Sequence, residues 1–422
     1  MFFFVLLISV QNYHYQTLFM TKIKPFRGYF PKSNLGAEIS TKPLNTYSDE
    51  EIQQLMKRNS NSFLHIILHD EKERKMELND RFSKIKQLFE ESIENGNFEQ
   101  SATESFYVYR QSGNGKSYCG IIGGAFAEDY QNGKIKKHEL TLKKREKLFT
   151  KYLTLTGFNA EPVLLVYPKK EAISALIDST MGSTPIHDFT SEDNLHHQLW
   201  EISNKKDIEL IESNFSEIPN IYIADGHHRS ASSNRLSLLD RGKESKQYIM
   251  SLLMSDEDVH IYDFNRVIKN SEKLSFEEIK EKLSKEFSIL EESDNLLSPR
   301  EKHEFTIYLF ERWIRIKLIK VFNPNSGIIE QLDSQIITDS ILAPIFDIKE
   351  LTKDKRVNFV PGNKGLDSLQ DKVDNGKYDI AIAMYPVSFG ELKLIADNDL
   401  IMPPKSTYIE PKLRSGLTVY KF

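Results

Sequence analysis

IYIADGHHRSA, residues 221–231, is an apolar run that ends at an acid, turns at a glycine and enters a segment rich in serine, alanine and asparagine. The pattern predicts a strand, a tight turn and a helix whose first turn contains His227, His228 and Arg229. Backbone N–H groups are unpaired at the start of a helix, and the helix dipole is positive there. Together with the planar guanidinium of Arg229, this arrangement predicts a site for phosphate oxygens.

The same residues are also compatible with a capped helix that bears two partly exposed histidines, and the stretch alone leaves both interpretations open. Asp225 has three possible roles, namely capping the helix, orienting a histidine or holding a cation. Joint metal binding by His227 and His228 is disfavoured, because adjacent helical residues point about 100° apart.

Strand-like and helix-like segments alternate on both sides of this stretch. We expect strands at 163–167, 221–224, 248–254 and 379–384, and hairpins from 106–111 with 118–126 and from 305–310 with 313–319. Helices are expected after a capping box at 48–51, along an apolar stripe at 78–93, and at 275–287 and 389–397. Strands mixed with helices and hairpins predict an α/β (mixed α+β) protein.

The composition narrows the function classes. Of the 422 residues, 39% are hydrophobic and 28% are charged, as in soluble globular proteins, and the net charge of -5 argues against a general nucleic-acid binder. A single cysteine, Cys119, excludes an intrachain disulfide and a four-cysteine zinc site. We interpret it as a buried small residue of a strand rather than a nucleophile.

The first ten residues are strongly apolar. They lack the basic start and the cleavage pattern of a signal peptide, and the run is too short to span a bilayer. We therefore interpret residues 1–19 as an extension or a start-site artefact, and we expect a cytoplasmic protein without a membrane contact.

Asp225–Arg229, following an apolar strand, resembles the signature of free L-serine kinases with the ParB/sulfiredoxin-like fold. Two further stretches occur in the order of that family. The sequence IKKHE at 135–139 resembles its Lys-Pro-His-Glu segment, and MPPKST at 402–407 resembles its closing Pro-Lys-(Thr/Ser)-Thr segment.

The region from about Met20 to Leu417 also resembles a longer branch of this family, linked to serine phosphorylation with inorganic pyrophosphate. Lys24–Arg27 and Asp354–Arg356 are further shared stretches. The chain departs from the branch after the His-Glu pair, where Leu142–Arg145 replaces a helix rich in arginine, proline and acids. This departure adds positive charge near the expected phosphate site and puts the donor preference in doubt.

The resemblance implies a ParB/sulfiredoxin-like core with additional mixed-sheet subdomains. It divides the chain into an N-terminal α/β subdomain at 20–130, a motif-bearing catalytic core at 131–270, and a C-terminal α/β subdomain at 271–422 that completes the site. The implied activity is phosphoryl transfer to free L-serine, giving O-phospho-L-serine with pyrophosphate as donor, and cysteine biosynthesis is the implied pathway. An ADP- or ATP-dependent kinase and a ParB-like nucleotide-binding regulatory protein are the alternatives.

The resemblance also implies roles for individual residues. Glu139 is the expected base for the serine hydroxyl, His138 holds Glu139 or the substrate, and Asp225 contacts the serine ammonium or a magnesium ion. The implied phosphate or donor ligands are Gly226, His227, His228, Arg229, Lys405, Ser406, Thr407, Lys355 and Arg356.

Several of these residues also have a purely structural interpretation. Glu139 would then belong to a surface Lys-His-Glu run, residues 405–407 to a rigid loop, and residues 354–356 to a solvated charge cluster. Mg²⁺ is expected with the donor, while its protein ligands and the oligomeric state stay open. The expected partners are L-serine and pyrophosphate or a nucleotide, without nucleic acid. The sequence contains no Walker-type loop and no kinase catalytic loop, which disfavours the common ATP-binding folds.

Overall fold

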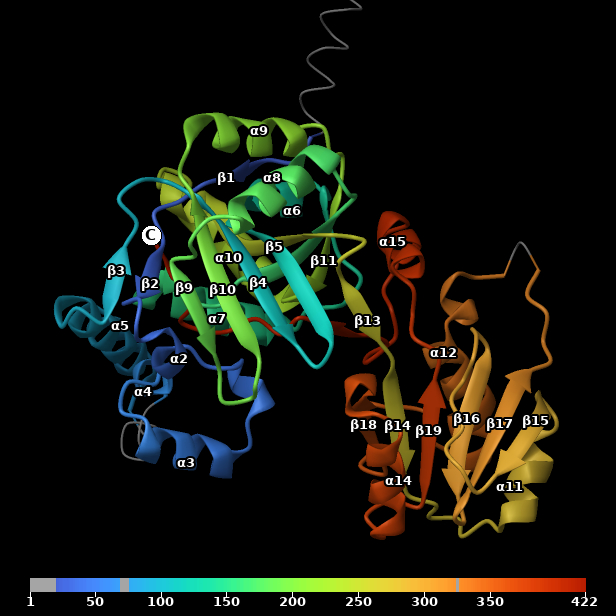
Figure 1. Cartoon of the computed structure of the whole chain (residues 1–422). Helices are drawn as coiled ribbons and strands as arrows, with labels where there is room; N and C mark the ends of the chain where they lie inside the picture. The colour runs from blue at the N-terminus through green and yellow to red at the C-terminus, as the bar shows by residue number, and fades with distance from the viewer. Residues whose placement is uncertain (1–19, 69–75, 324–325) are drawn as a thin grey trace, which may run out of the picture. The chain divides into compact units, whose positions relative to one another are not determined.

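The structure is a computed structural model that describes residues 20–68, 76–323 and 326–422. The interpretation of residues 1–19 therefore concerns a segment outside the described residues. The chain forms two compact units (Figure 1), the first ending at Val259 and including Pro411–Phe422, the second comprising His260–Glu410. It is a mixed α/β protein, as the sequence predicts. The ParB/sulfiredoxin-like core stays a prediction.

The first unit is built on a nine-stranded mixed sheet with the order β6-β11-β8-β12-β5-β4-β10-β9, and β1 pairs with β5. β6–β11 and β8–β12 run parallel, and the other neighbours are antiparallel. The strands are β1 (Ile23–Lys24), β4 (Phe106–Gly113), β5 (Lys116–Phe126), β6 (Ile135–Lys136), β8 (Val163–Tyr167), β9 (His187–Thr190), β10 (His196–Ile202), β11 (Ile221–Asp225) and β12 (Tyr248–Ser255). The boundary expected between residues 130 and 131 falls inside this sheet.

The helices of the first unit are α2 (Gly36–Ile39), α3 (Asp49–Arg58), α4 (Leu64–Ile67), α5 (Leu78–Glu94), α6 (Ala127–Gln131), α7 (Lys143–Thr156), α8 (Glu171–Met181), α9 (Lys205–Phe215) and α10 (His227–Leu239). Some helices of the first unit lie over the sheet, and others, such as α3, lie to one side of it (Figure 1). Ile173 of α8 and Phe215 of α9 belong to one apolar cluster with residues of β8, and the ring of Phe215 lies 4.8 Å from that of Tyr167. All five residues of β8 are buried. Because β8 is buried on both faces, its sequence VLLVY is continuously apolar instead of alternating.

Several local expectations are confirmed. The capping box at Ser48 and Glu51 begins α3. The stripe of α5 buries Phe82 and Phe89 in a second apolar cluster. Cys119 lies in β5 but is half-buried rather than fully buried. Burial raises the pKa of its thiol to about 12, so that the thiol stays protonated at neutral pH.

The second unit contains an antiparallel six-stranded sheet with the order β15-β17-β16-β19-β14-β18. Its strands are β14 (Phe264–Ile268), β15 (Phe287–Ser293), β16 (Glu304–Leu309), β17 (Arg312–Leu318), β18 (Val357–Pro361) and β19 (Ile380–Met384), and β13 (His260–Tyr262) pairs separately with β20 (Tyr408–Glu410). Its helices are α11 (Phe276–Leu283), α12 (Asp333–Ile337), α13 (Ala343–Phe346), α14 (Asp367–Asp374) and α15 (Phe389–Asp397). Alternate residues of β16 enter two different apolar clusters, so both faces of this sheet are buried.

One helix of the second unit is shorter than its apolar pattern predicts. The expected helix at 275–287 ends at Leu283, and Phe287 begins β15 instead. Phe287 pairs with Leu318 in the sheet, and its ring lies 5.7 Å from that of Phe305. Sheet pairing and aromatic packing therefore override the helical spacing at this end.

Residues 411–422 form part of the core of the first unit. β21 (Tyr420–Lys421) pairs with β7 (Phe158–Asn159), and Ser415 exchanges backbone hydrogen bonds with Thr41. Gly416 donates its N–H to the Ala160 carbonyl at 2.9 Å and has a φ of 78°. The sequence analysis did not predict this association, because two-residue strands give no periodic signal.

Replacing Gly416 tests how tightly this terminal segment packs. A Cβ atom there would lie 2.5 Å from Cγ of the buried Phe63, in addition to the strained φ. Gly96 is a matched control, because its φ is 74° but no atom lies within 4 Å of an added Cβ. Both Gly→Ala variants lose about 1–2 kcal/mol from the left-handed backbone. Gly416→Ala is expected to lose roughly a further 1–3 kcal/mol through overpacking, measured by urea unfolding, and equal losses in the two variants would contradict the prediction.

Candidate functional site

The stretch quoted at the outset folds as predicted. β11 ends at Asp225, Gly226 forms the turn, and α10 begins at His227. Gly226 has a φ of 98°, and an added Cβ would lie 2.9 Å from Nε of Arg229. Position 226 therefore requires glycine for two reasons, the left-handed backbone of the turn and the close approach of the Arg229 guanidinium.

The composition of α10 explains how its first turn is held. Serine and alanine residues line its buried side, and α10 packs against α6 and α7. The hydroxyls of Ser230 and Ser232 donate hydrogen bonds to the carbonyls four residues earlier, those of Gly226 at 3.2 Å and His228 at 2.7 Å. These small side chains allow close helix packing while their own polar groups stay satisfied.

A parallel pairing places a second segment beside this turn. β6 pairs with β11, with Ile135 opposite Ile221 and Lys136 opposite Tyr222. Parallel strands end at the same edge of a sheet. The residues that follow β6, His138 and Glu139, are therefore next to the turn after β11.

The imidazole of His227 joins the two segments. Its Nε2 accepts a hydrogen bond from the His138 backbone N–H at 3.4 Å, and its Nδ1 lies 3.5 Å from Oε2 of Glu139. Because Nε2 is the acceptor, the ring proton belongs on Nδ1, facing the carboxylate. Burial lowers the pKa of His227 to about 3, so the ring is neutral at physiological pH.

His138 is buried against the same ring. The two imidazoles meet edge to face with centroids 4.5 Å apart, and His138 is only 1% exposed. Burial, followed by the neighbouring His227, lowers the pKa of His138 to about 3. Within residues 20–68, 76–323 and 326–422, neither ring nitrogen of His138 has a hydrogen-bond partner. Glu139, in contrast, has a side chain that is 48% exposed.

Four charged groups surround the turn. Nη2 of Arg229 lies 2.7 Å from Oδ2 of Asp225, and Nη1 contacts Glu161. The other oxygen of Asp225 pairs with Nζ of Lys412 at 2.8 Å. Burial lowers the pKa of Arg229 to about 10, which leaves it charged at neutral pH. The two cations and two carboxylates balance, so a bound anion would take over donors that now serve Asp225 and Glu161.

His228 faces a different environment from its neighbour. Its pKa is lowered by burial and then by the charge of Arg145, and its ring is only partly buried. The two adjacent histidines therefore do not share one environment, as the helical geometry predicts.

The remaining candidates belong to the second unit. Ser406 is buried, shares a hydrogen bond with Ser334 at 2.8 Å and donates to the Pro403 carbonyl. Lys405 places its Nζ over the Phe264 ring at 4.8 Å, and Thr407 is half-buried.

Two further candidates of that unit differ in exposure. Arg356 pairs with Asp354 and donates to the carbonyls of Phe346 and Asp347, whereas Lys355 is exposed. Their participation, and that of residues 405–407, in a site with Glu139 and Arg229 stays a prediction.

Sequence reasoning missed Glu161 and Lys412. Glu161 precedes β8, whose Leu164 lies opposite Asp225 in the antiparallel β8–β11 pair. Lys412 lies in the terminal segment, where Ser415 also donates to Glu161 at 3.2 Å. A weak signal existed in the sequence PKLRS at 411–415, which combines two cations with a proline, but only the tertiary structure brings it to Asp225.

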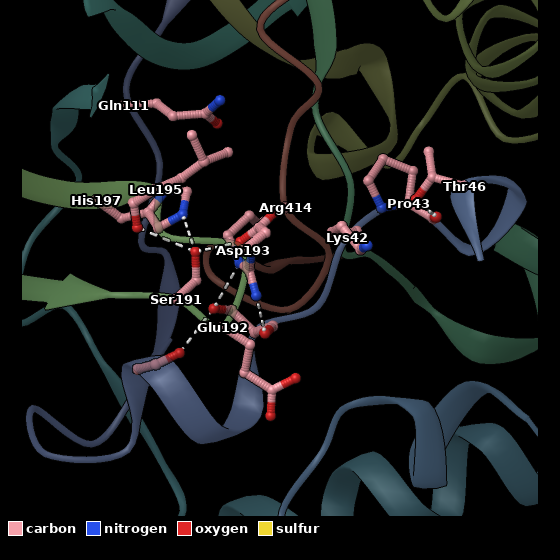
Figure 2. Close-up of polar contacts among 12 residues, drawn as sticks. Lys42, Pro43, Thr46, Gln111, Ser191, Glu192, Asp193, Leu195, His197 and Arg414 are labelled. Carbon is pink, nitrogen blue, oxygen red and sulfur yellow. Dashed lines mark hydrogen bonds and ion pairs between the residues drawn. The ribbon is translucent and has the colours of Figure 1, made fainter. Parts of the chain in front are cut away.

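The terminal segment is fixed by Arg414, two residues after Lys412. Figure 2 shows the Arg414 side chain between the turn that joins β9 to β10 and the chain near Lys42. Arg414 donates to the Ser40 carbonyl at 2.6 Å and lies 3.5 Å from Oδ1 of Asp193. This buried cation anchors the segment that brings Lys412 to Asp225.

The same network contains serine, histidine and aspartate side chains (Figure 2). Ser191 donates to Asp193 at 2.5 Å, and Nε2 of His197 lies 2.9 Å from the Ser191 hydroxyl. Tyr109 contacts Nδ1 of His197 at 2.8 Å. Because the serine proton goes to Asp193, the imidazole acts toward Ser191 as a donor and not as a base. Tyr109, Ser191 and His197 are buried, and Asp193 pairs with the buried Arg414. We therefore assign this cluster a structural role.

The chain resembles one protein-family model and several solved structures. The family model described as "Protein of unknown function (DUF1015)" matches residues 23–335. Free serine kinase in complex with AMP is 16% identical, with a TM-score of 0.34, over 68% of this chain and 87% of that chain. SbnI with a C-terminal truncation, from Staphylococcus aureus, is 10% identical, with a TM-score of 0.35, over 68% of this chain and 82% of that chain.

A conserved hypothetical protein from Pyrococcus furiosus is 16% identical, with a TM-score of 0.32, over 68% of this chain and 90% of that chain. Likenesses at this level provide no argument about function. No curated protein matches the chain. Among the described helices, none combines the length and the apolar character needed to cross a bilayer.

The buried His197 predicts an acid-sensitive first unit. Burial, and then the charge of Arg414, lower the pKa of His197 from 6.5 to about 3. Between these two values the unfolded chain binds a proton that the folded chain excludes, so stability falls as the pH decreases below 6.5. His197→Gln removes this group. The free energy of unfolding of the variant should therefore depend less on pH than that of the unaltered chain, and the two slopes should differ by up to about 1.4 kcal/mol per pH unit.

Urea unfolding at about pH 6 and pH 5 measures this difference. His196→Gln is the control, because it changes the adjacent histidine, whose side chain is 38% exposed. We expect the control to keep the slope of the unaltered chain. Identical slopes for all three proteins would show that His197 titrates normally.

Proposed function

The chain belongs to the family described as protein of unknown function (DUF1015), and from its site we propose that it is a phosphotransferase acting on free L-serine. The product is O-phospho-L-serine, and the proposed donor is inorganic pyrophosphate. An ADP- or ATP-dependent serine kinase is the second donor assignment. The observation on which the proposal depends is the approach of Glu139 to the turn that contains Arg229.

Glu139 and Arg229 come from separate segments with opposite chemical properties. Glu139 offers an exposed carboxylate, whereas the turn offers the start of α10 and a guanidinium. The 3.5 Å approach of Glu139 to His227 brings a proton acceptor to the edge of an anion site. This combination is what phosphoryl transfer to an alcohol requires.

We propose that Glu139 accepts the proton of the serine hydroxyl as this oxygen attacks the donor phosphorus. The hydroxyl is a poor nucleophile at neutral pH, and a positioned base contributes about 10²–10⁴ in rate. The Nδ1–H of His227 faces the carboxylate and would orient it, with His138 closing the buried side.

The turn and the first residues of α10 would hold the transferring phosphate. Gly226 lets the backbone approach an anion closely, and His228 lies in the same first turn. The guanidinium of Arg229 would offset the charge that develops on the phosphate oxygens. Lys412, found only through the structure, adds a second cation on Asp225.

Magnesium is proposed to arrive with the donor. Mg²⁺ prefers oxygen ligands and often has few from the protein. Two carboxylates beside the turn, Asp225 and Glu161, are engaged by Arg229 and Lys412. The arrangement therefore favours an ion bound mainly by the donor phosphates, with Asp225 available to the serine ammonium once a phosphate has taken Arg229.

Residues of the second unit are further proposed ligands of the donor. Lys355 and Lys405 are exposed cations, and Arg356, Ser406 and Thr407 lie beside them in the sequence. A small donor such as pyrophosphate requires a dense cationic cage rather than a pocket for a nucleobase, and the resemblance implies these residues as donor ligands. This part of the proposal depends on the sequence resemblance.

A donor panel tests the proposed function. The purified chain is incubated with serine, Mg²⁺ and either pyrophosphate, ADP or ATP, and phosphoserine is measured by mass spectrometry. We expect product with pyrophosphate and a loss of roughly 10²–10⁴ in rate for Glu139→Gln, because the amide cannot accept the proton. Glu192→Gln, at an exposed glutamate paired with Arg58, should retain full activity.

Absence of product with every donor across a pH range would reject the kinase assignment. Nucleotide binding without turnover would then favour the ParB-like regulatory alternative. An active Glu139→Gln variant would leave the kinase assignment in place but remove Glu139 from its role.

Lys412→Met tests the cation that the structure adds to the site. Loss of its charge beside Asp225 should raise the KM for the donor by about tenfold, equivalent to about 1.4 kcal/mol, with a smaller effect on kcat. Lys421→Met is a matched control in the same terminal segment, where Lys421 lies 3.5 Å from Glu90. Equal KM values for the two variants would exclude Lys412 from donor binding.

A further inference from the structure

We propose that His138, Glu139 and His227 form a binding site for a divalent transition-metal ion of the zinc class. One ligand atom from each of these side chains lies within 4.8 Å of the other two. The site is argued from the side chains alone. Only its effect on catalysis, given below, depends on the proposed function.

The first observation concerns His138. Its side chain is 1% exposed, and in the part of the chain that the structure describes both ring nitrogens are without a hydrogen-bond partner. Buried polar groups in folded proteins nearly always have one, and an exception indicates an ion, a water molecule or a functional requirement. One ring nitrogen of His138 lies within 4.8 Å of the ligand atoms of Glu139 and His227, and a metal ion bound among them would give this nitrogen a partner.

The second observation is the spacing of the other two groups. Nδ1 of His227 and Oε2 of Glu139 are 3.5 Å apart. Two ligands at about 2.0–2.2 Å from one ion are separated by such a distance in a tetrahedral site. Coordination through Nδ1 moves the ring proton to Nε2, so it breaks the long 3.4 Å hydrogen bond that Nε2 accepts from the His138 backbone N–H, and the metal bond has to outweigh this loss.

The donor set identifies the class of metal. Two imidazole nitrogens and one carboxylate are ligands of zinc and its neighbours, whereas Mg²⁺ prefers oxygen. Three protein ligands leave one position open, and the exposed carboxylate of Glu139 provides access from solvent.

The proposed metal ion and the proposed serine substrate require the same carboxylate. A metal-bound Glu139 no longer has a free oxygen to accept the hydroxyl proton. If the chain is a serine kinase, zinc occupancy therefore inhibits it, while Mg²⁺ supports it through the donor. The site would make the activity sensitive to the free zinc concentration.

Metal binding to the full chain tests this proposal without serine or a phosphoryl donor. The chelator-treated protein is dialysed against Zn²⁺ in the presence of excess Mg²⁺, and the bound metal is quantified. We expect one high-affinity Zn²⁺ ion per chain that Mg²⁺ does not displace. Glu139→Gln and His138→Gln should each weaken binding at least ~10-fold, since loss of an outer-shell partner already has such an effect.

His196→Gln is the matched control, because His196 pairs with Asp188 at an exposed position and offers an alternative His–carboxylate ligand pair. Its affinity for Zn²⁺ should be unchanged. Circular dichroism establishes that each variant is folded. Should His138→Gln unfold, the exposed Glu139 still gives a folded variant that decides the question.

A lack of stoichiometric binding, or equal affinity in the unaltered chain and in Glu139→Gln, overturns the metal site. Phosphoserine formation in a zinc-free buffer with Mg²⁺ is measured separately. A chain that binds zinc but makes no phosphoserine would contradict the kinase proposal alone. A chain that makes phosphoserine but binds no zinc would contradict the metal proposal alone.

Discussion

The candidate site depends on one short parallel pairing, that of β6 with β11. Only two residue pairs form it, Ile135 with Ile221 and Lys136 with Tyr222. Side chains alternate along a strand, and a slip of one residue would turn each of them to the opposite face. The buried Ile135 and Ile221 prevent that slip because both belong to the core of the first unit. Hydrophobic burial thereby sets the position of the Glu139 carboxylate relative to the start of α10.

The charged groups around this pairing form a second level of organisation. Arg229 and Lys412 neutralise Asp225 and Glu161, and Arg414 anchors the segment that contains Lys412. Partly buried ion pairs of this kind cost desolvation and contribute little net stability. Their benefit is positional, since each charge restricts where the others can lie. An anion that replaced one carboxylate would find its cations already in place.

The sequence predicted the local parts of this arrangement well and its long-range parts poorly. The β11–turn–α10 unit follows from a change of period, a glycine and a helix start, all within a dozen residues. The meeting of Glu139 with His227 came from a family resemblance, because strand pairing between distant segments leaves no local pattern. Glu161 had neither a local pattern nor a family resemblance, and Lys412 had only the weak signal of the PKLRS stretch. At Phe287 a local pattern misled the prediction. Its spacing fits a helix, but Phe287 begins β15 and pairs with Leu318 in the sheet.

The division of the first unit into two stretches of chain has a consequence for its synthesis. Pro411–Phe422 completes the core, yet these residues leave the ribosome only after His260–Glu410 has been made. Domains generally fold as units during translation. While the second unit emerges, the nascent first unit therefore lacks the two backbone bridges that join Tyr29 to Val419 and Thr41 to Ser415. Lys412 reaches Asp225 at the end of this order of events, so its ion pair joins the network around the turn only after the second unit has been made.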